Sequence, residues 1–186
     1  DTLEGFGGAV VLDGDAGNDL VLGGAGNDTL RGGTGNDTLQ GAGGDDLAEG
    51  GAGLDALHGS SGADTLAGGA DSDLLEGDEG NDQLTGGTAA DTLRGGAGAD
   101  TYLYNRGDGQ DLVVELDAQT TGGASVDVLR FGAGIAPAEL VTGLELRNPT
   151  GALGSVNFFE QNVDVLYRIG DGSVRLRGPD DPWLFD

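Results

Sequence analysis

A nine-residue repeat constrains this chain more than any other feature of its sequence. From Gly14 to Leu103 the chain divides into ten consecutive rows of nine residues without an insertion. The first column is Gly in all ten rows, the fourth is Gly in eight, and the sixth is Asp in all ten. The eighth column holds Val21, Leu30, Leu39, Ala48, Leu57, Leu66, Leu75, Leu84, Leu93 and Tyr102. Self-similarity at a fixed short period predicts a repeat architecture in which neighbouring units stack.

The residue types in these columns predict an all-β coil. Glycine adopts positive φ without a Cβ clash, so the six Gly-rich columns predict a turn. The next three residues, with one apolar side chain between two others, predict a short strand with one side chain inward. Two rows then make one coil, and coils stack as parallel strands about 4.8 Å apart. The aspartates line up on two edges, with Asp19, Asp37, Asp55, Asp73 and Asp91 above Asp1 on one and Asp28, Asp46, Asp64, Asp82 and Asp100 on the other.

Such columns of aspartate predict bound cations. Like charges held about 5 Å apart are unfavourable unless a counter-charge neutralises them. The available ligands are carboxylates and the carbonyl oxygens of Gly-rich turns, and flexible sets of hard oxygen ligands suit Ca²⁺ better than Mg²⁺. Four Asp pairs on each edge predict about eight Ca²⁺ ions, and Asp1 with Asp19 is a candidate for a ninth. Eight ions carry +16 against a formal net charge of -25.

Composition excludes several classes of function. The chain has no Cys and no Lys, which excludes disulfide scaffolds, zinc–thiolate sites, Cys nucleophiles, P-loops and Schiff-base chemistry. Its one His, His58, falls in the ninth column and is expected to point outward. With 33 acidic and 8 basic residues, the surface is expected to repel nucleic acids and anionic membranes. No apolar run approaches the roughly 18 residues of a membrane span.

The rows resemble the RTX, or haemolysin-type, nonapeptide family. Gly23-Gly24-Ala25-Gly26-Asn27-Asp28-Thr29-Leu30-Arg31 and the row from Gly32 to Gln40 match its pattern without a departure, and the resemblance covers about residues 1–115. It implies a calcium-loaded parallel β-roll in proteins exported by type I secretion. It also implies that each ion binds sixth-column carboxylates from two turns and carbonyl groups from columns one to four. The metal ligands implied are Asp19, Asp28, Asp37, Asp46, Asp55, Asp64, Asp73, Asp82, Asp91 and Asp100, with the carbonyl groups of Gly23, Gly24, Ala25, Gly26, Gly32, Gly33, Thr34, Gly35, Gly41, Gly43, Gly44, Gly50, Gly51, Ala52, Gly53, Gly95 and Ala97.

Some rows depart from the family pattern. The departures are Val10, Asp15, Ala42, Ser60, Asp71, Asp78 and Ala89. Val10 stands where Asp belongs, so we expect its half-site to lack a ligand. Asp71 and Ala89 replace fourth-column glycines, so we expect strained or weaker sites at these two rows.

The second half of the chain is a different kind of sequence. Eight of the nine aromatic residues lie from Tyr102 onward. Alternating stretches at 111–116, 127–131, 162–169 and 173–177 predict antiparallel strands packed on the last coil, and 137–141 predicts one helical turn. We therefore expect a nonapeptide roll over 1–103, with a degenerate start at 1–13, and a β-rich C-terminal capping region over 104–186, which also resembles the segment that follows such arrays. The carboxylates Asp108, Asp111, Glu115 and Asp117 are interpreted either as ligands of a further ion or as surface groups of a turn.

The preferred function is a calcium-binding module without catalytic activity. We expect it to be disordered without Ca²⁺ and to fold on binding Ca²⁺ after secretion, which supports the export of a larger toxin, adhesin or hydrolase. The expected partners are calcium ions, the rest of the parent chain and the type I secretion apparatus, with no nucleic acid and no membrane span, and the chain is expected to be a secreted, extracellular monomer. Asp1 is not a translation start, so a fragment or processed product is expected. The alternatives are a carbohydrate-binding repeat module attached to a polysaccharide-modifying enzyme or adhesin, and a retained fragment of a protease or lipase.

Overall fold

The fold is all-β in the part of the chain that the computed structural model describes, which is residues 1–109, 111–114, 127–132, 145–147 and 164–167. Its strands follow one another at nine-residue spacing along most of the chain. They are β1 (Thr2–Glu4), β2 (Val11–Asp13), β3 (Leu20–Ala25), β4 (Thr29–Thr34), β5 (Thr38–Gly43), β6 (Leu47–Ala52), β7 (Ala56–Ser61), β8 (Thr65–Ala70), β9 (Leu74–Glu79), β10 (Gln83–Thr88), β11 (Thr92–Ala97), β12 (Thr101–Tyr104), β13 (Leu112–Val114), β14 (Asp127–Phe131), β15 (Glu145–Arg147) and β16 (Asp164–Tyr167).

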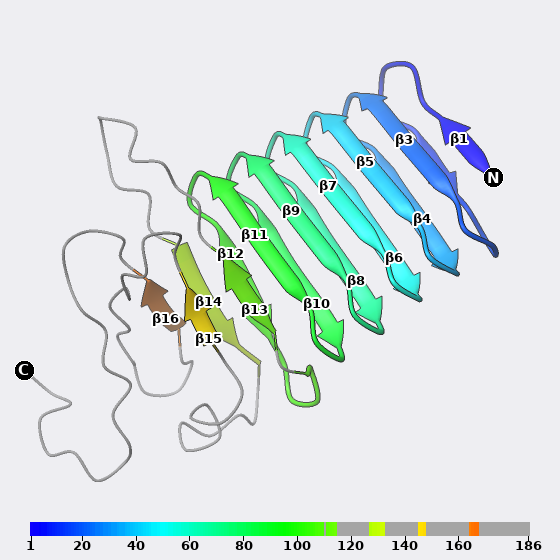
Figure 1. The fold of residues 1–186 in the computed structure, drawn as a ribbon. Coiled ribbons are helices and arrows are strands. Elements are labelled where there is room, and N and C mark those ends of the chain that lie inside the picture. Colours follow the sequence, from blue (N-terminus) through cyan, green and yellow to red (C-terminus); the bar gives the residue numbers. More distant parts are fainter. Residues whose placement is uncertain (110, 115–126, 133–144, 148–163, 168–186) are drawn as a thin grey trace, which may run out of the picture.

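Successive strands alternate between two sheets, which is the topology of a parallel β-roll. One sheet has the order β1-β3-β5-β7-β9-β11-β13-β15, and the other has the order β16-β14-β12-β10-β8-β6-β4-β2. Paired residues in neighbouring strands are 18 positions apart, so that Val21 pairs with Leu39 and Leu39 pairs with Leu57. Figure 1 shows the coils stacked in chain order from the N-terminus at one end. The predicted fold class is confirmed.

The strands are longer than the sequence predicted. A typical strand such as β3 has six residues, and it contains the last three columns of one row and the first three of the next. The Gly-Gly-x segment therefore pairs with its neighbours as well, as Gly24 does with Ala42 and Ala25 with Gly43. Extended pairing satisfies the backbone N–H and C=O groups of these columns, which are close to a neighbouring coil. The turn is consequently reduced to columns four to six.

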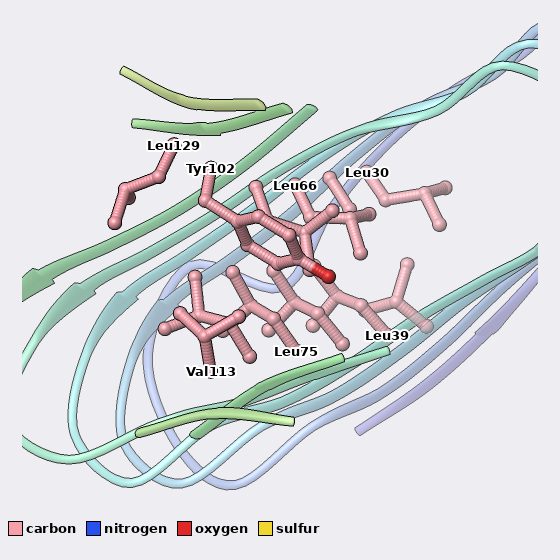
Figure 2. Packing of buried hydrophobic residues seen from close by; sticks show 12 residues of the cluster. Leu30, Leu39, Leu66, Leu75, Tyr102, Val113 and Leu129 are labelled. Atoms are coloured by element: carbon pink, nitrogen blue, oxygen red, sulfur yellow. The ribbon is translucent and has the colours of Figure 1, made fainter. Parts of the chain in front are cut away.

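The core is one ladder of apolar side chains between the two sheets. All ten eighth-column residues, from Val21 to Tyr102, are at most 3 % exposed. Figure 2 shows Leu39, Leu75 and Val113 from one sheet facing Leu30, Leu66, Tyr102 and Leu129 from the other. The prediction that the eighth column forms the core is confirmed. Each row contributes a single apolar side chain to it, large in every row except that of Ala48, so the core is narrow and continuous along the axis.

Beyond Leu103 the two sheets continue. β13 pairs with β11, β14 with β12 and β15 with β13, all in parallel, whereas β16 pairs with β14 antiparallel. The expectation of antiparallel strands is therefore wrong for β13 and β14, because these strands extend the parallel ladders of the roll, as does β15, which the sequence did not predict. The predicted stretch at 173–177 and the helical turn at 137–141 lie outside the described residues.

Candidate metal centre

The sixth-column aspartates form two hydrogen-bonded columns on the edges of the roll. In each pair the backbone N–H of one Asp donates to Oδ1 of the Asp 18 residues later, over 2.7–2.9 Å. Asp19, Asp37, Asp55, Asp73 and Asp91 make four such pairs on one edge, and Asp28, Asp46, Asp64, Asp82 and Asp100 make four on the other. The structure thus brings together the carboxylates that the sequence placed on each edge.

The second carboxylate oxygen is buried without a donor. In nine of these ten residues, all except Asp100, the residue is 1–4 % exposed and its Oδ2 atom has no hydrogen-bond partner among the described residues. A buried charged oxygen with no donor and no counter-charge is strongly unfavourable. A cation is the group that would satisfy it.

Carbonyl oxygens converge with these carboxylates at the first-column glycines. A Cβ placed on Gly50 would lie 2.6 Å from Asp55 Oδ2 and 2.6 Å from the carbonyl oxygen of Gly68, in the next turn of the same edge. Side-chain carbon atoms do not fit there, whereas two hard oxygen atoms facing a common space are the donor set that Ca²⁺ prefers. Among the described residues no group of three or more His, Cys, Asp or Glu side chains converges. Each candidate site therefore combines two carboxylates with backbone carbonyl groups.

The predicted carbonyl ligands lie in the turns and in the strand ends that lead into them. The carbonyl oxygens of the first-column residues Gly23, Gly32, Gly41, Gly50 and Gly95 each face the first-column glycine two rows earlier. Those of Gly26, Gly33 and Gly35 face the turn two rows later. The third-column carbonyls of Thr34, Gly43, Ala52 and Ala97 accept an N–H from a fourth-column glycine at 2.7–2.8 Å. A carbonyl oxygen has a second lone pair, so these groups keep one position for a ligand.

Burial perturbs the aspartates of these columns. It is the largest cause that raises the pKa of Asp46 and Asp64 to about 6 and the pKa of Asp73 to about 7. Neighbouring carboxylates raise the pKa in each case, and the hydrogen bond from a backbone N–H lowers it. The pKa values of Asp55, Asp82 and Asp91 are raised for the same first reason. Without a cation, the folded edges therefore disfavour the charged form of their own ligands.

Rows that depart from the Gly pattern carry backbone strain. Asp71 and Ala89, in the fourth column, have φ of 74° and 93°, which confirms the expectation of strain there. Four second-column residues, for which strain was not predicted, are also left-handed: Asp15, Ala42, Ser60 and Asp78. Non-Gly residues in this region cost of order 1–2 kcal/mol each. The other rows have glycine in this second column, with positive φ. That column of glycines is the sequence signal that could have identified the four strained residues.

The first turn of the array is incomplete. Val10 stands where other rows have Asp, and only its backbone N–H reaches the column, donating to Asp28 Oδ1 at 2.9 Å. Val10 supplies no carboxylate, so the expectation that its half-site lacks a ligand stays a prediction. At the other edge the amino group of Asp1 lies 2.5 Å from Asp19 Oδ1.

One aspartate outside the nonapeptide rows belongs to the columns. The Asp91 N–H donates to Asp111 Oδ1 at 3.1 Å, and Asp111 is 5 % exposed. Sequence reasoning left Asp111 open between a ligand and a surface group, and its burial is incompatible with the surface reading. Asp108 lies in the adjoining loop, while Glu115 and Asp117 are outside the described residues. The spacing Gly109-x-Asp111-x-Val113, which repeats columns four, six and eight, is the signal that could have shown this.

His58 lies on the outer face of β7, where its half-buried ring contacts a carboxylate. Its Nδ1 is 3.1 Å from Glu76 Oε2, and Glu76 also pairs with Arg94. These three side chains stand in the ninth column of successive rows of one sheet. The ladder stabilises the sheet surface modestly, and it is separate from the two Asp columns.

Comparisons with known proteins agree with this geometry. The family described as the RTX calcium-binding nonapeptide repeat matches the chain in four successive copies, over residues 1–30, 22–57, 49–84 and 76–111. No curated protein matches the chain. Within the described residues, no helix is sufficiently long and apolar to cross a membrane. RTX repeats bind Ca²⁺, are typical of secreted bacterial proteins and form a structural rather than an enzymatic family. The match covers more than half of the chain, so this protein belongs to the RTX calcium-binding nonapeptide repeat family.

Proposed function

We propose that this protein is a calcium-triggered folding module in which about eight Ca²⁺ ions bind between stacked turns on the two edges. The observation that carries the proposal is the pair of Asp columns, in which the buried Oδ2 atoms of nine aspartates, all except Asp100, have no donor in the part of the chain that the structure describes. The ligands of each ion are two sixth-column carboxylates and the turn carbonyl groups that face them. Bound Ca²⁺ supplies the counter-charge that makes the burial of these oxygens favourable.

Under this proposal, the buried carboxylates also explain why the chain is disordered without calcium. Each row buries one apolar side chain and also a carboxylate, and burial raises the pKa of several of these carboxylates, among them Asp64 and Asp73. A high net charge and a small core per residue are the composition of chains that do not fold alone. Folding and metal binding are therefore coupled, because the complete ligand set exists only after two turns have stacked.

This coupling suits a protein that crosses a membrane before it folds. A chain that stays unfolded at low free calcium can be threaded through a secretion apparatus, and millimolar calcium outside the cell then folds it. RTX repeats are typical of type I secreted proteins. We accordingly place this module in a larger exported protein and assign it the task of supporting export and extracellular folding.

The experiment is a circular dichroism titration of the whole chain. We expect a disordered spectrum in chelator, a sigmoidal rise of β signal up to millimolar CaCl₂, and no such rise with MgCl₂ at equal concentration. Mg²⁺ requires stricter octahedral geometry and retains its water, so a flexible set of carbonyls does not select it. A fully folded spectrum in chelator would contradict calcium-triggered folding.

We also propose that residues 104–186 close the C-terminal end of the roll. Solenoids require atypical terminal units, and β13 to β15 continue the two sheets beyond Leu103. A chain ending at residue 103 should require more calcium to fold than the whole chain. Equal calcium midpoints for the two chains would show that 104–186 are dispensable for folding.

A further inference from the structure

The end of one edge carries a turn that the nonapeptide rows do not contain. The last complete row ends at Leu103, and the next aspartate of that column, Asp111, follows Asp91 by 20 residues instead of 18. Despite this insertion, β13 keeps the register of the roll, with Leu112 opposite Thr92 and Val113 opposite Leu93. Val113 is 6 % exposed and belongs to the same core cluster as the eighth-column leucines.

Two backbone contacts show that this turn stacks like the others. The Leu112 N–H donates to the Asp91 carbonyl at 2.7 Å, as the Leu74 N–H does to the Asp55 carbonyl at 2.9 Å. Gly109 lies directly against the carbonyl of Ala89, the fourth-column residue of the preceding row on this edge. Fourth-column glycines such as Gly44 pack in the same way, with a Cβ position 2.5 Å from the Gly26 carbonyl oxygen. Gly109 and Asp111 therefore occupy columns four and six of an eleventh, degenerate turn.

The loop that replaces the missing columns is held by its own polar groups. The Tyr104 hydroxyl donates to the Gly109 carbonyl at 2.6 Å and to the Asp108 carbonyl at 3.1 Å. Asp108 Oδ2 accepts the Asn105 N–H at 2.6 Å and its side-chain amide at 3.3 Å. Asp108 thus fixes the loop, while the neighbouring Asp111 carboxylate is left to the column.

The two carboxylates at this end face one another in a buried setting. Asp91 is 2 % exposed, its Oδ2 has no donor among the described residues, and Asp111 is 5 % exposed. The opposite edge differs: at Gly95 the Tyr102 hydroxyl accepts the backbone N–H at 2.6 Å. A Cβ on Gly95 would lie 2.5 Å from that hydroxyl, whereas a Cβ on Gly77 would lie 2.6 Å from the Gly95 carbonyl oxygen, so at Gly95 the hydroxyl is near the Cβ position as a carbonyl oxygen is at Gly77. A hydroxyl closes one edge, whereas a second buried carboxylate ends the other.

We propose that Asp91 and Asp111 hold an additional Ca²⁺ ion at the C-terminal end of this edge, beyond the eight sites of the nonapeptide rows. The proposal rests on the calcium binding of the rows themselves, because Asp91 also belongs to the preceding Asp73–Asp91 pair. The ion fastens the eleventh turn, and with it β13, to the last complete coil. Calcium therefore orders the junction at which the chain leaves the repeats.

Calcium content of the whole folded chain after equilibrium dialysis tests this site. Asp111→Asn should bind one ion fewer per chain than wild type, because the amide nitrogen replaces a carboxylate oxygen. Asp108→Asn is the matched control from the same loop: it removes an equal charge, keeps an acceptor for Asn105 and should leave the count unchanged. Equal counts for wild type and Asp111→Asn would overturn the proposal. A wild-type protein without bound calcium would instead refute the proposed function of the rows.

A second measurement covers the case in which Asp111→Asn does not fold. Crystals of the wild-type chain grown with Tb³⁺ in place of Ca²⁺ should show an anomalous peak between Asp91 and Asp111, in addition to peaks between the 18-residue pairs. Peaks at those pairs and none at Asp91–Asp111 would overturn the additional site while leaving the proposed function intact.

Discussion

Replacing a single aspartate should remove either one calcium site or two, depending on its place in the column. Asp64 lies between two carboxylates, since it accepts the Asp46 N–H at 2.8 Å and donates to Asp82 Oδ1 at 2.9 Å. Asp28 is followed by Asp46 but preceded by Val10, which offers only its N–H. Asp64→Asn therefore weakens two candidate sites and Asp28→Asn weakens one. Asparagine keeps an Oδ1 acceptor for the incoming N–H, so the ladder itself is preserved.

The magnitude follows from linkage. At a calcium concentration of about ten times the dissociation constant of a site, binding stabilises the folded state by about 1.4 kcal/mol per site. Loss of two sites then lowers the free energy of unfolding by about 3 kcal/mol for Asp64→Asn, against about 1.4 kcal/mol for Asp28→Asn. At roughly 2–4 °C per kcal/mol for a chain of this size, the melting temperatures should fall by roughly 6–12 °C and 3–6 °C.

The assay is thermal unfolding followed by circular dichroism at fixed CaCl₂, with the calcium midpoint measured in parallel. A control without calcium separates ligand loss from misfolding. In chelator with an osmolyte that favours compact states, Asp64→Asn should be at least as stable as wild type, because it removes a buried carboxyl with a raised pKa. Equal losses in the two variants, or a loss for Asp64→Asn that persists in chelator, would refute the assignment of Asp64 to two sites.

Three further outcomes follow from the structure. The folded-state pKa values of Asp46, Asp64 and Asp73 are raised from 3.8 to about 6–7. Their protonation therefore stabilises the folded state, fully below about pH 4, and this stabilisation is lost as the pH rises through 6–7. In calcium-free buffer the β signal should grow from pH 8 to pH 5, and a signal that does not change with pH would contradict this. Ala89→Gly relieves the strain of a left-handed φ of 93° and should lower the calcium midpoint of folding. Gly53→Ala places a methyl group at a φ of 128° and against the Gly35 carbonyl, so it should raise that midpoint. The reverse order of midpoints would show that fourth-column strain is unimportant. Leu57→Ala leaves a cavity at a fully buried position and should lower the free energy of unfolding in calcium by about 2–5 kcal/mol. Leu54 is 56 % exposed, so Leu54→Ala should lower it by less than about 0.5 kcal/mol. Similar losses in the two variants, measured by thermal melting, would contradict the core assignment.

Sequence periodicity predicted the core and the Asp columns because each is set by one residue type at one position in every row. Val21, Leu57 and Tyr102 could be placed inside, and Asp64 on an edge, without any three-dimensional information. Strand length could not be predicted in this way. Whether a Gly-Gly-x segment turns or extends depends on hydrogen bonds to a coil 18 residues away, as at Gly24 and Ala42, and local preference for positive φ does not contain that information.

The place of Asp111 in the column could not be predicted from the sequence for a related reason. Two extra residues between Leu103 and Gly109 break the nine-residue count, so a search for columns at fixed spacing stops at Leu103. In the structure the insertion is absorbed by a loop, and the register resumes at Leu112 because Val113 fits the core and the β11 edge is open for pairing. The physical requirement is a stacked strand and a buried side chain, and a constant number of residues between them is only its usual consequence.

The pattern of glycine substitution within the array indicates which constraint dominates the repeat. Columns two and four require positive φ, yet they accept Asp78, Ala42 and Ala89 among others. First-column glycines such as Gly50 and Gly59 have no left-handed φ, so their backbone does not require glycine, but this column is Gly in all ten rows. The difference is space: a Cβ on Gly50 would enter the gap between Asp55 Oδ2 and the Gly68 carbonyl. Backbone strain of about 1–2 kcal/mol is tolerated in single rows, whereas a methyl group between a carboxylate and a carbonyl would block the position of the cation and leave both oxygens buried and unsatisfied. The repeat is therefore most strictly constrained at the oxygen-lined space, where the proposed calcium ions bind.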